Sequence, residues 1–568
     1  MNMNNKKKSL IRLGLIVSIL ILLNVVAYFF YGFYDLTEDK RYSVTKPTQE
    51  LIKNLDERVF ITVYLEGEFP AGFRRLQGGV KDVLKKFRSL SPKVNYQFID
   101  PNAGEVKEVN ALHEQLQKMG IGATNLVVKG GTERKEIRIF PAAVLTYKGR
   151  SAPINLLEEN RVGVDQEVVL NNSIQQLEFK FANALSIVKD ADRKRIFFTS
   201  GHGELMPIET ADLQKTLSQY HYTGRINLDS IVQINPIIDI LIVAKPTRPF
   251  SERDKFKIDQ YLMNGGKVIW AVDRLGAGLD SLRGGSGHVP IDYPLELDDM
   301  FFKYGARLNT NMVLDLEATP IPLQIGGTPQ DPQYDFFDWW YHPAVAPTNV
   351  NHPIVKGLDK IDLKFAGSID TIKTTLGNIK KSVILKSSTQ SRSQFAPTRV
   401  NFEILRYEPD RSKFNKQFNL GVLLEGTFSS HYRNRVPQSM QDTLKIIGSP
   451  FKDFSEPTAM IVLSDGDILR NPIRIQNGKA SPMPLGYNEF ARYTFANKDF
   501  IFNCIEYLLG KDGLMEARSK ELKLRMINES KVQKERSYWQ FINIGLPLIF
   551  LAIFGGIFNY IRMRRYAR

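Results

Sequence analysis

The sequence lacks most of the motifs by which an enzyme is recognised. Its single cysteine, Cys504, excludes an internal disulfide, so packed cores must stabilise the fold. No CxxC, no HExxH and no GxxxxGK[ST] occurs in the 568 residues, and the seven histidines are scattered. These absences argue against redox exchange and a zinc protease, and any energy from ATP must come from another polypeptide.

The excess of positive over negative charge is also small in the body of the chain. The net charge is +15, but the ends, 1–34 and 541–568, hold eight Lys or Arg and no acid. No recognised nucleic-acid module accompanies the remaining charge, so we expect no nucleic-acid partner. With 43% hydrophobic and 24% charged residues the composition is that of globular protein, long enough for about three or four domains.

Two long uncharged runs stand near the ends, at 13–34 and 541–561. Each has about the 20 residues that a bilayer core requires. Basic residues precede the first run and follow the second, which predicts two transmembrane helices with both termini in the cytoplasm and 35–540 in the periplasm. The first run could instead be a cleaved signal peptide, but its length and the lack of a small-x-small site favour an anchor.

The first body, 35–165, alternates strand and helix patterns. A strand pattern at 59–67 is followed by a basic amphipathic helix at 73–90, a second strand and helix, and then hairpin-like strands. This order resembles a thioredoxin-like domain. Without a CxxC, no redox role follows from the resemblance.

The second body, 166–290, predicts a doubly wound α/β domain. Apolar strands "RIFFTS", "IDILIVAKP" and "KVIWAVD" alternate with helices, one of them over 251–264. Residues 291–510 show short strands, prolines and turns, which predicts a β-rich region. A charged helix over 511–540 would lead to the second span, and the predicted divisions are 1–12, 13–34, 35–165, 166–290, 291–510, 511–540, 541–561 and 562–568.

The turn "TSGHGE" follows the first strand of the second body and is the main candidate site. In parallel sheets, ligands bind at the carboxyl ends of strands. A ligand site there would use Ser200, Gly201, His202, Gly203 and Glu204, together with Asp273 after a later strand. The sequence favours a glycine-permitted structural turn over ligand binding, and ligand binding over catalysis.

The arrangement also resembles the class I glutamine amidotransferase fold, whose nucleophilic cysteine stands on a sharp elbow after a core strand. The equivalent strand here leads into Lys245 and Pro246. Cys504 cannot substitute, because it lies on the apolar face of a predicted helix. Without an activated nucleophile, the amidotransferase-like domain is predicted to be non-catalytic, with no catalytic residue.

Metal and cofactor sites are not predicted. His202 and Glu204 are metal-ligand types, but no partnered histidine follows them. Asp465 and Asp467 in "SDGDILRN" resemble half of a calcium loop whose glycine spacing and bidentate glutamate are missing, so an Asp-capped turn is expected.

Aromatic residues gather in "YDFFDWWYHPAV". If exposed, Trp339, Trp340 and Tyr341 would form a sugar platform or a partner anchor. If buried, they belong to a strand of a β-rich core, which the sequence favours.

The predicted pre-membrane helix carries dense mixed charge. It is either a solvated stalk with i,i+4 pairs or a rigid connector that docks on a membrane partner. The docking candidates are Arg518, Lys520, Lys523 and Arg525.

Several segments together resemble one family over nearly the whole chain. They are "DLTEDKRYSV", "FPAGFRRL", "TSGHGE", "SDGDILRNP" and the end "RSKELKLRMINESKVQKERSYWQFINIGLPLIF" with "IFNYIRMRRY". The family is that of the gliding-motility-associated ABC transporter auxiliary proteins of Bacteroidota, the GldG family. The resemblance implies a complex with a GldF-like permease and a GldA-like ATPase, and a midchain domain similar to a non-catalytic domain of intraflagellar transport proteins.

The sequence therefore predicts a non-enzymatic, membrane-anchored auxiliary subunit of an ABC-type complex in the cytoplasmic membrane. Importer binding proteins usually diffuse or hang on one anchor, whereas this chain is expected to be fixed at both ends. Two alternatives remain: an extracytoplasmic receptor for a small solute or saccharide, and a hydrolase centred on His202.

Overall fold

The computed structural model describes residues 5–29, 43–119, 121–130, 133–157, 166–189, 193–282, 287–328, 332–446, 448–490, 493–510 and 538–566. The chain forms two compact units, Met1–Lys520 and Glu521–Arg568. Most of the predicted pre-membrane helix, 511–537, lies outside the described residues, and so do Arg518, Lys520, Lys523 and Arg525.

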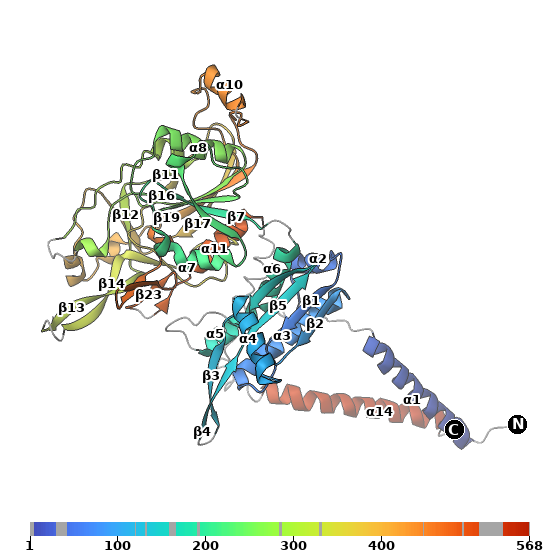
Figure 1. Cartoon of the computed structure of the whole chain (residues 1–568). Helices are drawn as coiled ribbons and strands as arrows, with labels where there is room; N and C mark the ends of the chain where they lie inside the picture. The colour runs from blue at the N-terminus through green and yellow to red at the C-terminus, as the bar shows by residue number, and fades with distance from the viewer. Residues whose placement is uncertain are drawn as a thin grey trace. The chain divides into compact units, whose positions relative to one another are not determined.

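A four-stranded sheet organises the first part of the larger unit (Figure 1). Its order is β2-β1-β5-β6; β1 and β2 are parallel, and β5 and β6 are antiparallel additions. Its strands are β1 (Val59–Val63), β2 (Val94–Phe98), β5 (Ala142–Tyr147) and β6 (Arg150–Asn155), with the hairpin β3 (Thr124–Gly130) and β4 (Glu133–Ile139) beside it. The helices of this part are α2 (Lys46–Lys53), α3 (Ala71–Leu90), α4 (Val106–Lys118), α5 (Gln166–Gln175) and α6 (Leu177–Lys189).

Helix α3 shows why these residues fold as they do. Its apolar side chains recur every three or four residues, so they form one stripe that packs on the sheet. The buried members of this stripe are Phe73, Leu76, Val80, Leu84 and Phe87. The sequence predicted this helix over 73–90, and the structure confirms it.

A seven-stranded sheet forms the centre of the larger unit, in the order β17-β19-β20-β10-β9-β7-β8. The five strands from β20 to β8 are parallel, and β19 and β17 are antiparallel additions. The strands are β7 (Arg195–Ser200), β8 (Tyr222–Asn227), β9 (Ile240–Ala244), β10 (Lys267–Ala271), β17 (Asn378–Lys386), β19 (Asn419–Thr427) and β20 (Thr458–Leu463).

Helices cover both faces of this sheet. All of β9 is buried, and its alternate residues enter two cores: Ile240 and Ile242 pack with helices α7 (Ala211–Ser218) and α11 (Asn497–Leu508). Leu241 and Val243 pack with α8 (Glu252–Met263) and α9 (Asp298–Tyr304). A strand buried on both faces is typical of a parallel sheet between helices.

The central sheet does not end at the predicted division at 290. Strands β17, β19 and β20 come from 378–463 and join β10, so the division runs through one sheet. The local sequence pattern shows that 458–463 is a strand. Its pairing with β10, about 190 residues away, cannot be predicted from that pattern.

Short sheets complete the larger unit. They pair β11 (Ala306–Leu308) with β16 (Ile369–Thr371), β12 (Asn311–Asp315) with β18 (Ser391–Phe395), β13 (Ala318–Gly327) with β14 (Pro332–Val345) and β15 (Ile361–Asp362), β21 (Ile473–Gln476) with β22 (Lys479–Pro482), and β23 (Tyr487–Asn488) with β24 (Tyr493–Thr494). Helix α10 (Gln438–Ile446) is also in this part. Prolines and turns interrupt the pattern here, which agrees with the predicted β-rich region.

Among the described residues, one helix is long and apolar enough to cross a membrane, Tyr538–Arg565, where the sequence predicted two. It comprises a π-helical turn, Phe541–Gly545, and α14 (Leu546–Tyr566). The first predicted span falls on α1 (Asn5–Phe29), whose apolar stretch Ile11–Asn24 is shorter, and residues 30–34 lie outside the described residues.

Candidate functional site at the carboxyl edge of the central sheet

The carboxyl ends of the five parallel strands gather polar side chains from distant parts of the chain. His202 follows β7, Asp229 follows β8, Lys245 follows β9, Asp273 follows β10 and Asp465 follows β20. Because these ends lie at one edge of the sheet, this edge is where a ligand would bind in an open α/β fold. The candidates of the sequence, Ser200–Glu204 and Asp273, lie along this edge.

The turn after β7 is pinned to the loop after β9. The backbone amides of Thr247 and Arg248 both donate to the His202 carbonyl at 2.9 Å. Gly203 has φ +73°, and a Cβ at this position would collide with Thr247 Oγ1. The glycine therefore permits both the left-handed backbone and the close approach, as expected for a structural turn.

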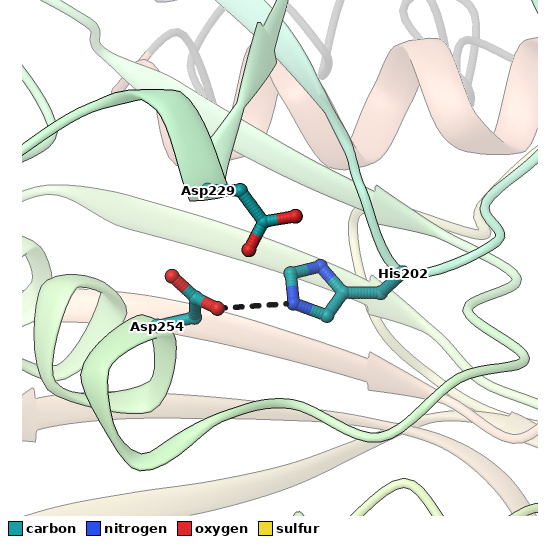
Figure 2. A group of neighbouring side chains, drawn as sticks. All are labelled: His202, Asp229 and Asp254. Carbon is teal, nitrogen blue, oxygen red and sulfur yellow. Dashed lines mark hydrogen bonds and ion pairs between the residues drawn. The ribbon is translucent and has the colours of Figure 1, made fainter.

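His202 is buried between the carboxylates of Asp254 and Glu204, and Figure 2 shows its contact with Asp254. Its Nε2 lies 3.3 Å from Asp254 Oδ2, its Nδ1 lies 3.6 Å from Glu204 Oε1, and its ring stacks on Phe250 with centroids 3.8 Å apart. Asp254 stands in the first turn of α8, which Ser251 caps. Burial opposes charge on the imidazole, but the nearby carboxylates of Glu204 and Asp254 outweigh it and raise the pKa of His202.

His202, Asp229 and Asp254 also form a donor set that could hold a metal ion. Their ligand atoms lie within 4.8 Å of one another, and imidazole with carboxylates suits zinc. Asp254, however, is already paired: Lys257 Nζ lies 2.7 Å from its Oδ1, and Ser251 Oγ donates to its Oδ2 at 2.6 Å. The ammonium group opposes a cation here, so the geometry fits a self-contained hydrogen-bonded cluster better than a metal centre.

The same geometry bears on the hydrolase alternative. In the described structure the ring nitrogens of His202 face carboxylates, not a hydroxyl or thiol. The nucleophile and base pair of a Ser-His or Cys-His hydrolase is therefore not assembled around His202. Cys504, the only thiol, is fully buried in the core under α11.

A second cluster occupies the elbow after β9. Lys245 has φ +53°, a left-handed backbone that is uncommon for a residue with a side chain. Its Nζ lies 2.9 Å from Asp273 Oδ2 and 2.5 Å from Asp467 Oδ2. The sequence singled out Asp273 but missed its pairing with Lys245, although acidic residues after two parallel strands and a lysine after a third were a usable signal.

Burial and neighbouring charges shift the pKa values of the lysine and the aspartates in this cluster. Burial opposes the charge of Lys245, but Asp273 and Asp467 outweigh it and raise its pKa. Burial also opposes ionisation of Asp467, yet Lys245 and Lys364 lower the pKa of Asp467, whereas burial raises the pKa of Asp465 and of Asp273. Lys245 is therefore a charged ion-pair partner and not a nucleophile. Asp465 Oδ1 accepts the Asp467 amide at 2.7 Å, which confirms the Asp-capped turn.

A groove of about 1720 Å³ opens above this cluster. Lys245 and Asp467 line it, as does His342, a buried side chain whose Nε2 has no hydrogen-bond partner. Two exposed rings of β14, Tyr334 and Phe336, lie along the same groove. The groove is therefore lined by both charged and aromatic side chains.

The predicted aromatic platform is not exposed. Trp339, Trp340 and Tyr341 are all buried, in one core cluster with Phe365 and Phe414. This agrees with the core interpretation that the sequence favoured. The exposed aromatics of the same strand precede them, and sequence reasoning did not separate the two groups.

Comparisons with known proteins add the following. A family model described as "ABC-type uncharacterized transport system" matches residues 193–504, and one described as "Domain of unknown function (DUF7088)" matches 38–146. The chain is 22% identical over 459 residues to an uncharacterized protein of Borreliella burgdorferi, covering 80% of this chain and 84% of the relative. The mmIFT52 N-terminal domain is a weak structural neighbour, with 11% identity and a TM-score of 0.30 over 56% of this chain and 97% of that one.

Proposed function

This chain belongs to the family described as an ABC-type uncharacterized transport system, and from that premise we propose that it is a non-enzymatic, membrane-anchored subunit of an ABC transporter complex. The family implies association with ABC transporter components. The finer assignment that we propose is a GldG-type subunit linked to gliding motility, which connects a GldF-like permease and a GldA-like ATPase to domains outside the membrane.

The observation that carries the non-enzymatic role is the residue at the elbow after β9. In an amidotransferase-like fold this position would hold the nucleophile, and here it holds Lys245, bound to Asp273 and Asp467. A charged, paired ammonium cannot attack a carbonyl. The position where the catalytic nucleophile would lie in such a fold is thus occupied by an ion-pair cluster.

The sheet topologies support the finer fold assignment. Two parallel strands with two antiparallel additions are consistent with a thioredoxin-like first domain, and the parallel core between helices with an amidotransferase-like second domain. Helix α6 contributes side chains to both cores, Phe181 to the first and Phe179 to the second. We propose that this shared helix lets the domains move as one body when a transporter subunit moves.

The topology that we propose has both termini in the cytoplasm and the large unit in the periplasm. The apolar helix Tyr538–Arg565 and the arginines that end it support an anchor with its end inside. Reporter fusions test this: a periplasm-dependent reporter inserted at the exposed 477–478 turn should be active, and one placed after 568 should be inactive. An inactive reporter at 477–478 with an active cytoplasmic reporter there would contradict the proposal.

Purification tests the complex itself. The full chain, tagged and extracted in mild detergent, should bring down a permease and an ATPase subunit in fixed ratio. A tagged chain that lacks 538–568 is the matched control, because it retains the large unit and loses the apolar helix Tyr538–Arg565. If neither subunit is recovered with the full chain, the proposed role is wrong.

A second candidate function is a receptor for a small solute or saccharide, and the groove above Lys245 favours it. Grooves that combine aromatic rings with a few charged groups are typical of solute sites. Replacing Tyr334 and Phe336 with alanine would separate the two roles, since it should abolish solute binding and leave recovery of the permease unchanged. If the variant still binds solute and still recovers the permease, the groove has no receptor role.

A further inference from the structure

A second groove, separate from the one described above, lies between α9, β11 and the turn at 431–435. Its volume is about 740 Å³. Five of its lining side chains are Lys or Arg: Arg274, which is paired with acids, and the four cations Lys303, Arg307, Arg433 and Arg435. The family relationship, the elbow cluster and the membrane helix do not account for them.

The two acidic residues of this groove face basic side chains other than the four cations. Asp298 Oδ1 binds Arg274 Nη1 at 2.8 Å. Asp299 Oδ2 lies 3.2 Å from His431 Nε2, and its Oδ1 lies 3.6 Å from Lys255 Nζ. The carboxylates that line the groove therefore do not balance the four cations.

The four cations have no acidic partner. Among the described residues, no carboxylate oxygen lies within 4.0 Å of the charged nitrogens of Lys303, Arg307, Arg433 or Arg435. Asp370 is the strand partner of Arg307, but its carboxylate accepts from Asn309 at 2.9 Å. Like charges around one hollow repel each other and attract a multivalent anion.

The backbone that carries these cations is anchored. In the turn, the His431 amide donates to Asp259 Oδ1 at 2.8 Å and the Ser430 hydroxyl to Asp259 Oδ2 at 2.7 Å, and Asp259 is fully buried. Arg433 lies over the ring of Phe454 at 4.6 Å, which orients its guanidinium. The backbone of the turn that carries Arg433 and Arg435 is therefore held in place, and the Arg433 guanidinium loses little freedom when an anion binds.

We propose that this groove binds a soluble ligand that carries two or more phosphate groups. Three guanidinium groups and one ammonium supply the forked donors and the charge that phosphates require. Neither transport coupling nor the solute groove requires this site, so the inference is independent of the proposed function.

The test uses the full chain in detergent at about 50 mM salt, titrated with inorganic tripolyphosphate by calorimetry. We expect saturable binding with one site per chain. The double variant Arg307→Gln/Arg435→Gln should weaken binding by roughly 10- to 100-fold, because two charged contacts are lost. Both side chains are largely exposed, so the variant should fold.

The matched control is Arg411→Gln/Arg474→Gln, which removes the same charge from exposed positions outside the groove. It should bind tripolyphosphate as the unchanged chain does. Citrate, with three carboxylates and no phosphate, should bind at least several-fold more weakly. Absence of saturable binding, equal weakening in both double variants, or equally tight citrate binding would each overturn the proposal.

Discussion

Lys245 Nζ lies 2.9 Å from Asp273 Oδ2, so the residue after β9 is paired with a residue after β10. The lysine side chain is 12% exposed, and Asp467 closes the cluster from the other side. Strands β9 and β10 and the distant strand β20 therefore end on one ion-pair cluster. The cluster joins the carboxyl ends of these strands through ion pairs. The groove described above lies next to it.

Replacing Lys245 with methionine should strongly destabilise the protein. The change leaves Asp273 and Asp467 buried without their cation, which typically costs about 3–5 kcal/mol. The midpoint of denaturation, followed by the fluorescence of Trp270 and its neighbours in the core, measures the loss.

The control for this variant is Lys303→Met, which removes a lysine with no acidic partner in the described part of the chain and should change stability by less than about 0.5 kcal/mol. Equal stability of Lys245→Met and the unchanged chain would show that the cluster is not an important ion pair.

The sequence predicted local structure better than long-range pairing. The stripe of α3 and the helix predicted over 251–264 are set by residues within one or two turns, and both were found. The partnership of Lys245 with Asp467 spans 222 residues and depends on the strand order. No periodicity encodes that order, and for the same reason the predicted division at 290 cut through the sheet.

Burial within one strand was likewise only partly predictable. Strand β14 holds Tyr334 and Phe336, which are exposed, and Trp339 and Tyr341, which are buried. The residue types are alike, so the difference arises from what lies above each part of the strand. Sequence reasoning could therefore locate the aromatic segment but not the rings that face solvent.

Gly203→Ala tests whether the turn is structural. Gly203 and Gly478 have nearly the same backbone, φ +73° and +74°, but a Cβ at Gly478 would meet nothing within 4 Å. Both variants incur the strain of left-handed backbone, about 1 kcal/mol. Only Gly203→Ala also collides with Thr247, so it should lose a further 1–3 kcal/mol or so.

The two glycine variants are compared by their denaturation midpoints under the same conditions. If Gly203→Ala is no less stable than Gly478→Ala, the turn after β7 is looser than its hydrogen bonds to Thr247 and Arg248 indicate.

Cys504 should be chemically silent in the folded chain. It is fully buried, and burial raises its pKa well above the usual value for a thiol. Because the thiolate is the reactive species, a maleimide reagent should label the native chain slowly and the denatured chain completely. Mass spectrometry measures this directly, since the chain has one cysteine. Rapid labelling of the native chain would contradict the packing of α11 against the central sheet.

His202 should make stability depend on pH in a defined direction. Its pKa is raised in the folded state, because the nearby carboxylates of Glu204 and Asp254 outweigh burial. The stabilisation by the charged ring is present below the unfolded pKa near 6.5 and is lost as the pH rises through the folded pKa. The stability difference between the unchanged chain and His202→Gln should therefore be larger at about pH 6 than at about pH 8.5. Glu204→Gln removes one of the two carboxylates that face the ring and should flatten this dependence, whereas a difference that grows with pH would mean that the ring is neutral when buried.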